Sequence, residues 1–216
     1  MIVKTFPVGP LQCNCTILGD EETGEAIVID PGDEVERITT VLKAHSLTVK
    51  QILHTHAHFD HIGGTGTLKD KTAGEISLHK EDLFLYEAMG KQAELFGLPA
   101  DPEVTPIDHF LCHGDAIGFG KGRVIDVIHT PGHTPGSLTF QFRSSEKEKG
   151  LLFTGDTLFM GSIGRTDLWG GDFKEIIASI RTRILPLDDK LLVIPGHGPS
   201  TTIGQERKTN PFLVNA

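Results

Sequence analysis

The chain has 216 residues, of which 38% are hydrophobic and 23% charged, and its formal net charge is −9. This length can bury one substantial core, so we expect a single domain over residues 1–216. The acidic balance and the lack of a basic run argue against a nucleic-acid partner. The apolar runs, such as 26–29 and 191–194, are too short to cross a bilayer, and the N-terminus shows no secretory signal. We therefore expect a cytoplasmic protein with no membrane partner.

Short β-rich runs predict strands along most of the chain. In chain order they cover residues 2–6, 16–18, 26–29, 49–53, 124–128, 138–142, 151–153 and 191–194. Helices are predicted behind Asp33 and Asp172, because apolar residues follow at helical spacing and Glu36 and Glu175 complete a capping box. A third helix is predicted over residues 81–96. This order suits an α/β sandwich with mixed sheets inside and helices outside. No G-x-G-x-x-G follows a strand and opens a helix, which argues against the commonest dinucleotide-binding fold.

The densest group of metal-binding residue types follows the predicted strand at 49–53. It reads His54-Thr-His56-Ala-His58-Phe-Asp60-His61, and imidazole and carboxylate groups suit zinc, iron or manganese. In an extended chain His56 and His58 point the same way, since side chains alternate with a period of two, and both can hold one ion. Asp60 and His61 diverge in an extended chain, so a turn is needed to bring both to a second ion. The density argues against a polar loop in which the histidines are fortuitous.

Three more potential ligands each follow a predicted strand and sit in a glycine-rich turn: His133, Asp156 and His197. Loops at strand ends are where functional side chains concentrate. Each turn alone is a weak signal. Together with the cluster at 54–61 they supply roughly the number of protein ligands that a site for two metal ions needs.

In this order the motif His56-x-His58-x-Asp60-His61, followed by His133, Asp156 and His197, resembles the metallo-β-lactamase superfamily. The resemblance covers essentially the whole chain and implies an αββα sandwich with the site at the ends of the sheets. It also implies two divalent metal ions, with zinc as the first expectation and iron or manganese as alternatives. One ion is implied at His56, His58 and His133, the other at Asp60, His61 and His197, with Asp156 bridging them.

Further motifs are similar to the type II glyoxalases, or hydroxyacylglutathione hydrolases, in a short form without the helical C-terminal domain. They are Asp30-Pro-Gly, the run 129–137, Gly155-Asp156-Thr-Leu-Phe, Gly164-Arg165, Pro195-Gly-His197-Gly and Asn210-Pro-Phe. This resemblance implies a hydrolase of a small anionic thioester such as S-lactoylglutathione, in which a metal-bound hydroxide attacks the acyl carbon. We expect Asp60 to orient this nucleophile as well as to bind metal. Without the helical domain, fewer cationic groups are expected to hold glutathione.

Three further residues are candidates for supporting roles. Asp30 ends a predicted strand, and we expect it either to form a turn or to hydrogen-bond a ligand histidine. His54 shares parity with the ligand candidates that follow it, but the resemblance leaves it out, so we expect a supporting or structural role. Arg165 lies in a glycine-rich loop that either shapes the mouth of the site or is held by a local ion pair with Asp167.

Two other activities stay open. A lactonase or other ester hydrolase of this fold would use the same nucleophile. A persulfide dioxygenase would bind a single iron, for which His56, His133 and Asp156 suffice. A secreted β-lactamase is disfavoured, since no signal peptide is visible and the commonest type has a cysteine where this chain has Asp156. The sequence does not predict the oligomeric state.

Overall fold

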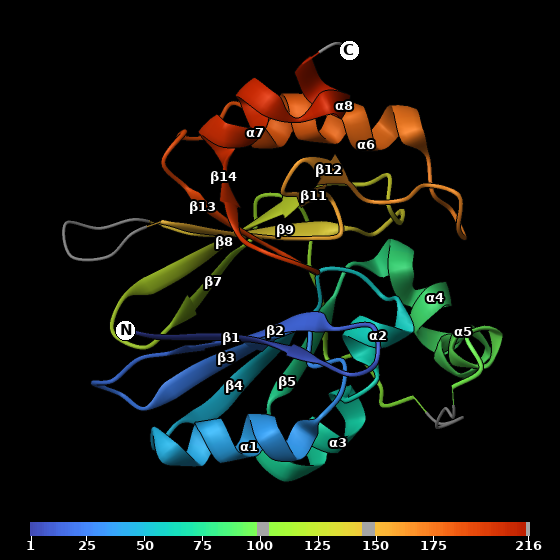
Figure 1. The fold of residues 1–216 in the computed structure, drawn as a ribbon. Helices are drawn as coiled ribbons and strands as arrows, with labels where there is room; N and C mark the ends of the chain where they lie inside the picture. The colour runs from blue at the N-terminus through green and yellow to red at the C-terminus, as the bar shows by residue number, and fades with distance from the viewer. Residues whose placement is uncertain (99–103, 144–149, 215–216) are drawn as a thin grey trace.

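Two β-sheets pack face to face in the computed structural model, which describes residues 1–98, 104–143 and 150–214 (Figure 1). Each of the two has six strands, and helices cover the outer face of each sheet. The αββα sandwich expected from the sequence is therefore confirmed. Within the described residues, no helix is both long enough and apolar enough to cross a membrane.

The first sheet comes from the N-terminal half of the chain and has the strand order β1-β2-β3-β4-β5-β6. Its strands are β1 (Ile2–Val8), β2 (Cys13–Gly19), β3 (Glu25–Ile29), β4 (Thr48–Leu53), β5 (Glu75–Leu78) and β6 (His109–Phe110). The pairs from β1 to β3 are antiparallel, whereas those from β3 to β6 are parallel. Two helices, α1 (Val35–Ala44) and α3 (Thr65–Thr72), cover its outer face, where Val28, Ile38 and Leu68 share an apolar cluster.

The second sheet has the strand order β14-β13-β10-β9-β8-β7. Its strands are β7 (Ala116–Phe119), β8 (Arg123–His129), β9 (Leu138–Phe142), β10 (Leu151–Gly155), β13 (Leu192–Pro195) and β14 (Thr201–Thr202). Only β10 and β13 pair in parallel. A small hairpin, β11 (Leu158–Phe159) with β12 (Ser162–Ile163), lies beside it. The outer face is covered by α6 (Phe173–Ser179), a π-helical turn (Ile180–Ile184), α7 (Ile203–Thr209) and α8 (Pro211–Val214), at the top of Figure 1.

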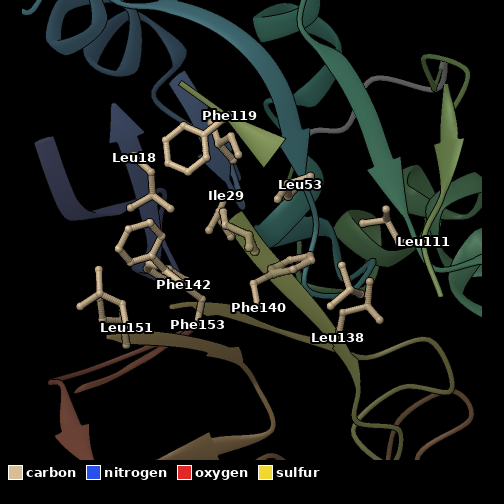
Figure 2. Packing of buried hydrophobic residues seen from close by; sticks show 14 residues of the cluster. Leu18, Ile29, Leu53, Leu111, Phe119, Leu138, Phe140, Phe142, Leu151 and Phe153 are labelled. Carbon is tan, nitrogen blue, oxygen red and sulfur yellow. The ribbon is translucent and has the colours of Figure 1, made fainter. Parts of the chain in front are cut away.

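The core between the sheets consists of large aliphatic and aromatic side chains (Figure 2). Leu18, Ile29 and Leu53 come from the first sheet and Phe140 and Phe142 from the second, and none is more than 2% exposed. Alternate residues of a strand face the same side, which is why Phe140 and Phe142 both point inward. Burying each such side chain contributes roughly 1.5–3 kcal/mol. This packing fixes the strand ends from which the ligand loops leave.

The segment after β5 is less regular than predicted. The single helix expected over residues 81–96 is wrong: a 3₁₀ turn (Lys80–Asp82) leads into α4 (Leu83–Glu87), and α5 (Met89–Leu95) follows separately. At the junction, the Leu85 carbonyl accepts a hydrogen bond of 2.7 Å from the Gln92 side chain. In an unbroken helix that carbonyl would pair with the main-chain N–H four residues on. A side-chain hydrogen bond therefore takes part where the helix is interrupted.

The two predicted capping boxes have different outcomes. Before α6, the Asp172 carboxylate accepts a hydrogen bond of 3.0 Å from Glu175 N, which confirms Asp172 as the N-cap. The reciprocal half of the box is wrong, because Asp172 N donates to the Gly132 carbonyl at 2.8 Å. Before α1 the prediction is wrong, because Glu34 takes the N-cap position with a left-handed backbone (φ 51°). The Asp33 carboxylate accepts instead from the adjacent Glu34 N at 2.6 Å. The Asp33 side chain therefore does not cap a main-chain N–H of the first turn of α1.

Candidate metal centre

The predicted ligands leave the carboxyl ends of four strands and meet at one end of the sandwich. His56 and His58 lie in the loop after β4, which continues into α2 (Phe59–Ile62) with Asp60 and His61. The remaining three follow strands of the second sheet: His133 after β8, Asp156 after β10 and His197 after β13. The structure thus brings all seven residues together, in overlapping groups whose potential ligand atoms lie within 4.8 Å of one another.

The first group contains the imidazoles of His56, His58 and His133. His56 Nδ1 lies 3.1 Å from Thr55 Oγ1, and that hydroxyl donates its own proton to Asp30. His56 Nδ1 is therefore the protonated nitrogen, and Nε2 carries a lone pair. His133 Nδ1 donates to the Arg165 carbonyl at 2.7 Å, which leaves its Nε2 unprotonated as well.

The free nitrogens of this first group converge on one point. His56 Nε2 and His133 Nε2 are 3.2 Å apart, and His58 Nδ1 lies 3.1 Å and 2.9 Å from them. Two lone pairs that face each other at this separation repel unless a cation lies between them. Nitrogens bound at about 2.0–2.1 Å to a common ion are separated by distances of this order. The donor set therefore fits a divalent transition metal.

The second group contains His61, His197 and Asp60. His61 Nδ1 donates to Asp30 Oδ2 at 3.0 Å, and His197 Nδ1 donates to the Leu11 carbonyl at 3.0 Å. Their Nε2 atoms, which these two hydrogen bonds leave available to a metal ion, lie 3.2 Å apart. Asp60 Oδ2 is 3.2 Å from His197 Nε2 and 3.7 Å from His61 Nε2. Two imidazole nitrogens and a carboxylate at these distances fit a second cation.

Asp156 lies between the two groups. Its Oδ2 is 3.6 Å from His133 Nε2 and 3.7 Å from His197 Nε2, while its Oδ1 is 3.5 Å from His61 Nε2. Within the described part of the chain, this buried Oδ1 has no hydrogen-bond partner. A buried carboxylate oxygen without a donor is costly, and a cation on either side would compensate for it. Asp156 therefore fits a bridging ligand.

The charges of the centre favour neutral imidazoles in the first group. Burial, reinforced by neighbouring imidazoles, lowers the pKa of His56 and of His58 well below the usual value. Burial also lowers the pKa of His61, but the Cys13 thiol and then the Asp60, Asp156 and Asp30 carboxylates outweigh it and raise that pKa well above the usual value. A negative potential that stabilises a proton on His61 stabilises a metal cation in the same way.

Glycines allow the ligand loops to approach one another closely. A Cβ on Gly196 would lie 2.1 Å from Asp156 Oδ1 and 2.8 Å from His61 Cε1, and a Cβ on Gly32 would lie 1.6 Å from the Asp60 carbonyl oxygen. All three distances are far below van der Waals contact. The turns before His197 and after Asp30 therefore require glycine for space.

Two of the predicted supporting residues lie at different distances from the ligands. Asp30 hydrogen-bonds a ligand histidine, His61, and also accepts from Thr55 N and Thr55 Oγ1 at 2.8 Å and 2.6 Å. His54 lies outside both groups, fully buried, with its Nε2 3.1 Å from Thr65 Oγ1. Although His54 alternates with His56 and His58 along the chain, it does not join the ligand groups, which agrees with the expected supporting or structural role.

A cleft of about 300 Å³ opens beside the centre. Ligand residues form part of its lining, and its apolar walls include Leu11, Phe96, Leu168 and Trp169. Arg165 is the one Lys or Arg among the described residues that line it, and its guanidinium donates two hydrogen bonds, of 2.7 Å and 2.8 Å, to Asp167. The cleft can therefore hold a small molecule with an apolar part.

Sequence reasoning missed three residues that hold the ligand loops. Asn14 Nδ2 donates to the Pro195 and Gly198 carbonyls, on either side of His197, at 2.9 Å each. Its sequence signal was an amide in an otherwise apolar strand. Asp82 and Gln92 hydrogen-bond the loop after β4. They gave no signal, since an acid and an amide are ordinary residues in a helical segment.

Comparison with known proteins agrees with this geometry. The family model of the Metallo-beta-lactamase superfamily matches residues 8–197. The protein named hydroxyacylglutathione hydrolase GloC, from Haemophilus influenzae, is 43% identical over 214 residues, which cover 99% of this chain and 98% of that protein.

Two solved structures are similar over nearly their whole length. BLEG-1, named a B3 metallo-beta-lactamase, has 42% identity and a TM-score of 0.89, with 99% of this chain and 100% of that chain covered. TTHA1623, in a di-iron-bound form, has 40% identity and a TM-score of 0.84, with 96% and 98% covered. The sandwich, the converging ligands and these similarities lead to one conclusion: the chain belongs to the metallo-β-lactamase superfamily.

Proposed function

We propose that this metal hydrolase of the metallo-β-lactamase superfamily cleaves a small anionic thioester such as S-lactoylglutathione with the help of two divalent ions. The observation that carries the proposal is the pair of converging ligand groups with Asp156 between them. The 43% identity to GloC supports a thioester as the substrate. A cytoplasmic location stays a prediction from the sequence.

Divalent ions bound here would polarise a carbonyl oxygen and lower the pKa of bound water from 15.7 to about 7. The residues that would hold them are His56, His58 and His133 for one ion, Asp60, His61 and His197 for the other, and Asp156 for both. We propose zinc first, with iron and manganese as alternatives, because imidazole and carboxylate suit all three metals. The di-iron form of TTHA1623 supports keeping iron among them.

Asp60 is the side chain best placed to orient the nucleophile. It lines the cleft, and its Oδ2 is 3.2 Å from His197 Nε2. Burial raises the pKa of Asp60, but His61 and His197 outweigh this and hold it far below its usual value. An ionised Asp60 can accept a hydrogen bond from the attacking species, whereas it has no proton to give to a leaving group.

The cleft favours substrates with a good leaving group. Among the described residues that line it there is no Lys, Tyr, Cys or Ser, and every imidazole there belongs to a ligand group. No uncommitted side chain of this lining can therefore protonate a departing amine or alkoxide. A thiolate, whose conjugate thiol has a pKa of about 8.5, leaves without that help. This lining favours a thioester over an ester or an amide.

Selectivity for glutathione is expected to be weak. Arg165 is paired with Asp167, so the described lining offers no uncommitted cation to a glutathione carboxylate. We expect kcat/KM for S-lactoylglutathione to exceed that for a simple lactoyl thioester by far less than roughly 10⁴-fold, the discrimination of a site built to hydrogen-bond its substrate. A larger preference would reveal a glutathione pocket built by other groups, such as those of a partner subunit. The oligomeric state is therefore measured on the same preparation.

A β-lactam is the second candidate substrate, because BLEG-1 is 42% identical and is named a B3 metallo-beta-lactamase. This similarity reopens an activity that the sequence disfavoured. Persulfide dioxygenation has less support: a single iron would leave the Asp60, His61 and His197 group without a purpose.

The test is a kinetic panel on protein of measured metal content. It compares S-lactoylglutathione, a simple lactoyl thioester, a lactone, a β-lactam and glutathione persulfide, the last with oxygen uptake recorded. We expect close to two ions per chain and the highest kcat/KM for the thioesters. At most one ion after reconstitution would contradict the two-metal centre. Fastest turnover of the β-lactam would favour the second candidate, and oxygen uptake with a single iron would favour the dioxygenase.

A further inference from the structure

Asp82 is a buried carboxylate that hydrogen-bonds two ligand loops. Its side chain is 0% exposed, and it ends the 3₁₀ turn before α4. Oδ2 accepts from Ala57 N at 2.9 Å and from Thr134 Oγ1 at 2.7 Å, and Oδ1 accepts from Gly136 N at 2.6 Å. None of these three hydrogen bonds goes to a ligand imidazole.

The donors to Asp82 lie beside all three imidazoles of the first group. Ala57 separates His56 from His58, and Thr134 directly follows His133. One carboxylate therefore joins the loop after β4 to the loop between β8 and β9. Because these loops leave different sheets, neither sheet alone sets their separation.

A role as a helix cap does not account for Asp82. It occupies the N-cap position of α4, but its side chain makes no capping hydrogen bond there. Burying a carboxylate is costly unless it is hydrogen-bonded, and N–H groups bond an ionised oxygen more strongly than a neutral one. A Cβ on Gly136 would lie 2.6 Å from Asp82 Cγ, so the loop approaches the carboxylate more closely than a residue with a side chain would allow. The carboxylate is thus committed to the ligand loops.

Gln92 holds the same stretch of main chain from α5. Its Nε2 donates to the Ala57 carbonyl at 3.0 Å, and its Oε1 accepts from Phe59 N at 3.3 Å. Both polar groups of Ala57 are therefore bonded by side chains. His58, the next residue, has a buried Nε2 without a hydrogen-bond partner in the described part of the chain. No polar partner orients its ring from that side, so its place depends on the main chain around it.

We propose that Asp82, assisted by Gln92, positions the group formed by His56, His58 and His133, so that loss of the Asp82 carboxylate selectively weakens binding of the ion at this first site. The inference rests on the proposed two-metal function. Selectivity is expected because the donors to Asp82 flank the imidazoles of the first group, whereas His61 is held by Asp30 and His197 by the Leu11 carbonyl.

The test is a titration of metal-free protein with cobalt(II), followed by visible absorption, with bound ions counted by elemental analysis. His133→Ala and His197→Ala supply reference spectra in which one group is incomplete. In Asp82→Asn, an amide NH₂ replaces a carboxylate oxygen and faces an N–H donor. We expect first-site affinity to fall roughly 10- to 100-fold, as for lost outer partners of metal ligands, while second-site affinity stays within the spread of replicates.

Glu206→Gln is the matched control for Asp82→Asn. Glu206 is also 0% exposed, and it accepts three hydrogen bonds, from Thr201 Oγ1, Gly161 N and Asn210 Nδ2, none from a ligand loop. Glu206→Gln disturbs a buried hydrogen-bond network of similar size, so an effect that comes from general destabilisation of the fold would appear in both variants. We expect Glu206→Gln to leave both cobalt affinities unchanged.

Thr134→Val keeps the Asp82 carboxylate and removes one of its hydrogen bonds, which covers the case in which Asp82→Asn does not fold. Its control is Thr201→Val, which removes the hydroxyl bonded to Glu206. We expect Thr134→Val alone to lower first-site affinity, by a smaller factor than Asp82→Asn. Equal losses at both sites, an unchanged first site in a folded variant, or an equal effect of either control would overturn the proposal. If the wild type binds a single ion, the two-metal function fails, and Asp82 is judged by whether Asp82→Asn weakens that ion.

Discussion

The two halves of the metal centre differ in how one imidazole, that of His58, is held, since His56 and His133 also have hydrogen-bond partners on their outer nitrogens. In the half with Asp60, both outer nitrogens are hydrogen-bonded, His61 Nδ1 to Asp30 and His197 Nδ1 to the Leu11 carbonyl. In the other half, His58 has no such partner among the described residues, and the main chain beside it is held by Asp82 instead. A ligand can therefore be oriented through its ring or through the backbone that carries it. In the second way the supporting residue is distant from the ligand in the sequence, and it makes no contact with the ligand ring.

Asp156→Ala should have the largest effect. Asp156 lies between the two halves and is the proposed ligand of both ions, so its loss should weaken both sites and not one of them. We expect both ions to be lost or strongly weakened and kcat to fall well beyond the roughly 100-fold that loss of an outer partner costs. Elemental analysis and kcat on the same preparation measure this. Retention of two tightly bound ions would show that Asp156 is not shared.

Asp30→Asn should weaken metal binding in both halves, but to different extents. Asp30 bonds His61 directly and reaches His56 only through Thr55 Oγ1. We expect the second site to lose roughly 10- to 100-fold in cobalt(II) affinity and the first site to lose less. Thr55→Val cuts the relay to His56 and leaves the direct bond from His61 to Asp30, so it should affect the first site more than the second. A larger loss of affinity at the first site in Asp30→Asn would show that Asp30 supports mainly the first site, and its assignment to the second would be wrong.

His54→Ala should leave metal binding in both halves unchanged. The side chain is fully buried but lies outside both ligand groups, so we expect two bound ions and near-normal kcat. The lost packing and hydrogen bond to Thr65 should lower the free energy of unfolding by roughly 1–3 kcal/mol. Chemical denaturation and metal analysis, with His56→Ala as the comparator, test both points. Metal loss equal to that of His56→Ala would mean that the wrong histidines were chosen.

Asp20→Asn should have the smallest effect on the centre, since Asp20 follows β2 at the end remote from Cys13 and the ligands. Burial raises the pKa of Asp20, but N–H donors of Lys121, Thr23 and Glu22 outweigh it and lower that pKa to about 2. A folded-state pKa below the ordinary 3.8 means that ionised Asp20 stabilises the fold above about pH 4, and that this contribution is lost as the pH falls towards 2.

We therefore expect the melting temperature of metal-free Asp20→Asn to lie below that of the wild type at pH 7, and the gap to narrow at pH 3. Cobalt(II) binding at pH 7 should match the wild type. A gap that widens in acid would contradict the assigned direction of the pKa shift. Weakened cobalt binding would mean that any buried carboxylate, not Asp82 in particular, affects the centre.

The features predicted from sequence share one property: they are local. His133, Asp156 and His197 each follow an apolar strand and sit beside glycine, which marks each as a potential ligand, and the resemblance to the superfamily implies that they converge. The cap at Asp172 needs only its own first turn. The failures involve contacts beyond the local pattern. The Gln92 side chain, which bonds Leu85 at the interruption near Ala88, also bonds the Ala57 carbonyl 35 residues away. Glu34, which has a left-handed backbone, accepts a hydrogen bond of 3.2 Å from Gly9 N.

Asp82 shows the same limit at the site itself. Its three donors come from residues 25, 52 and 54 positions away, and nothing in its immediate sequence marks it. Short strands such as β5 and β7 were missed for a related reason: four residues carry too little alternation to predict a strand without their neighbours.

Each ligand group takes residues from loops of both sheets, with His56 facing His133 in one and His61 facing His197 in the other. An ion in either group would therefore act as a cross-link between the two layers, and it would be a ligand of the folded state alone. Free metal at 1,000 times its dissociation constant adds about 4 kcal/mol to the free energy of unfolding. A chelator would then behave as a denaturant of this protein. In a metal-starved cell, proteolysis of the loosened sandwich would lower the amount of the protein in addition to its activity.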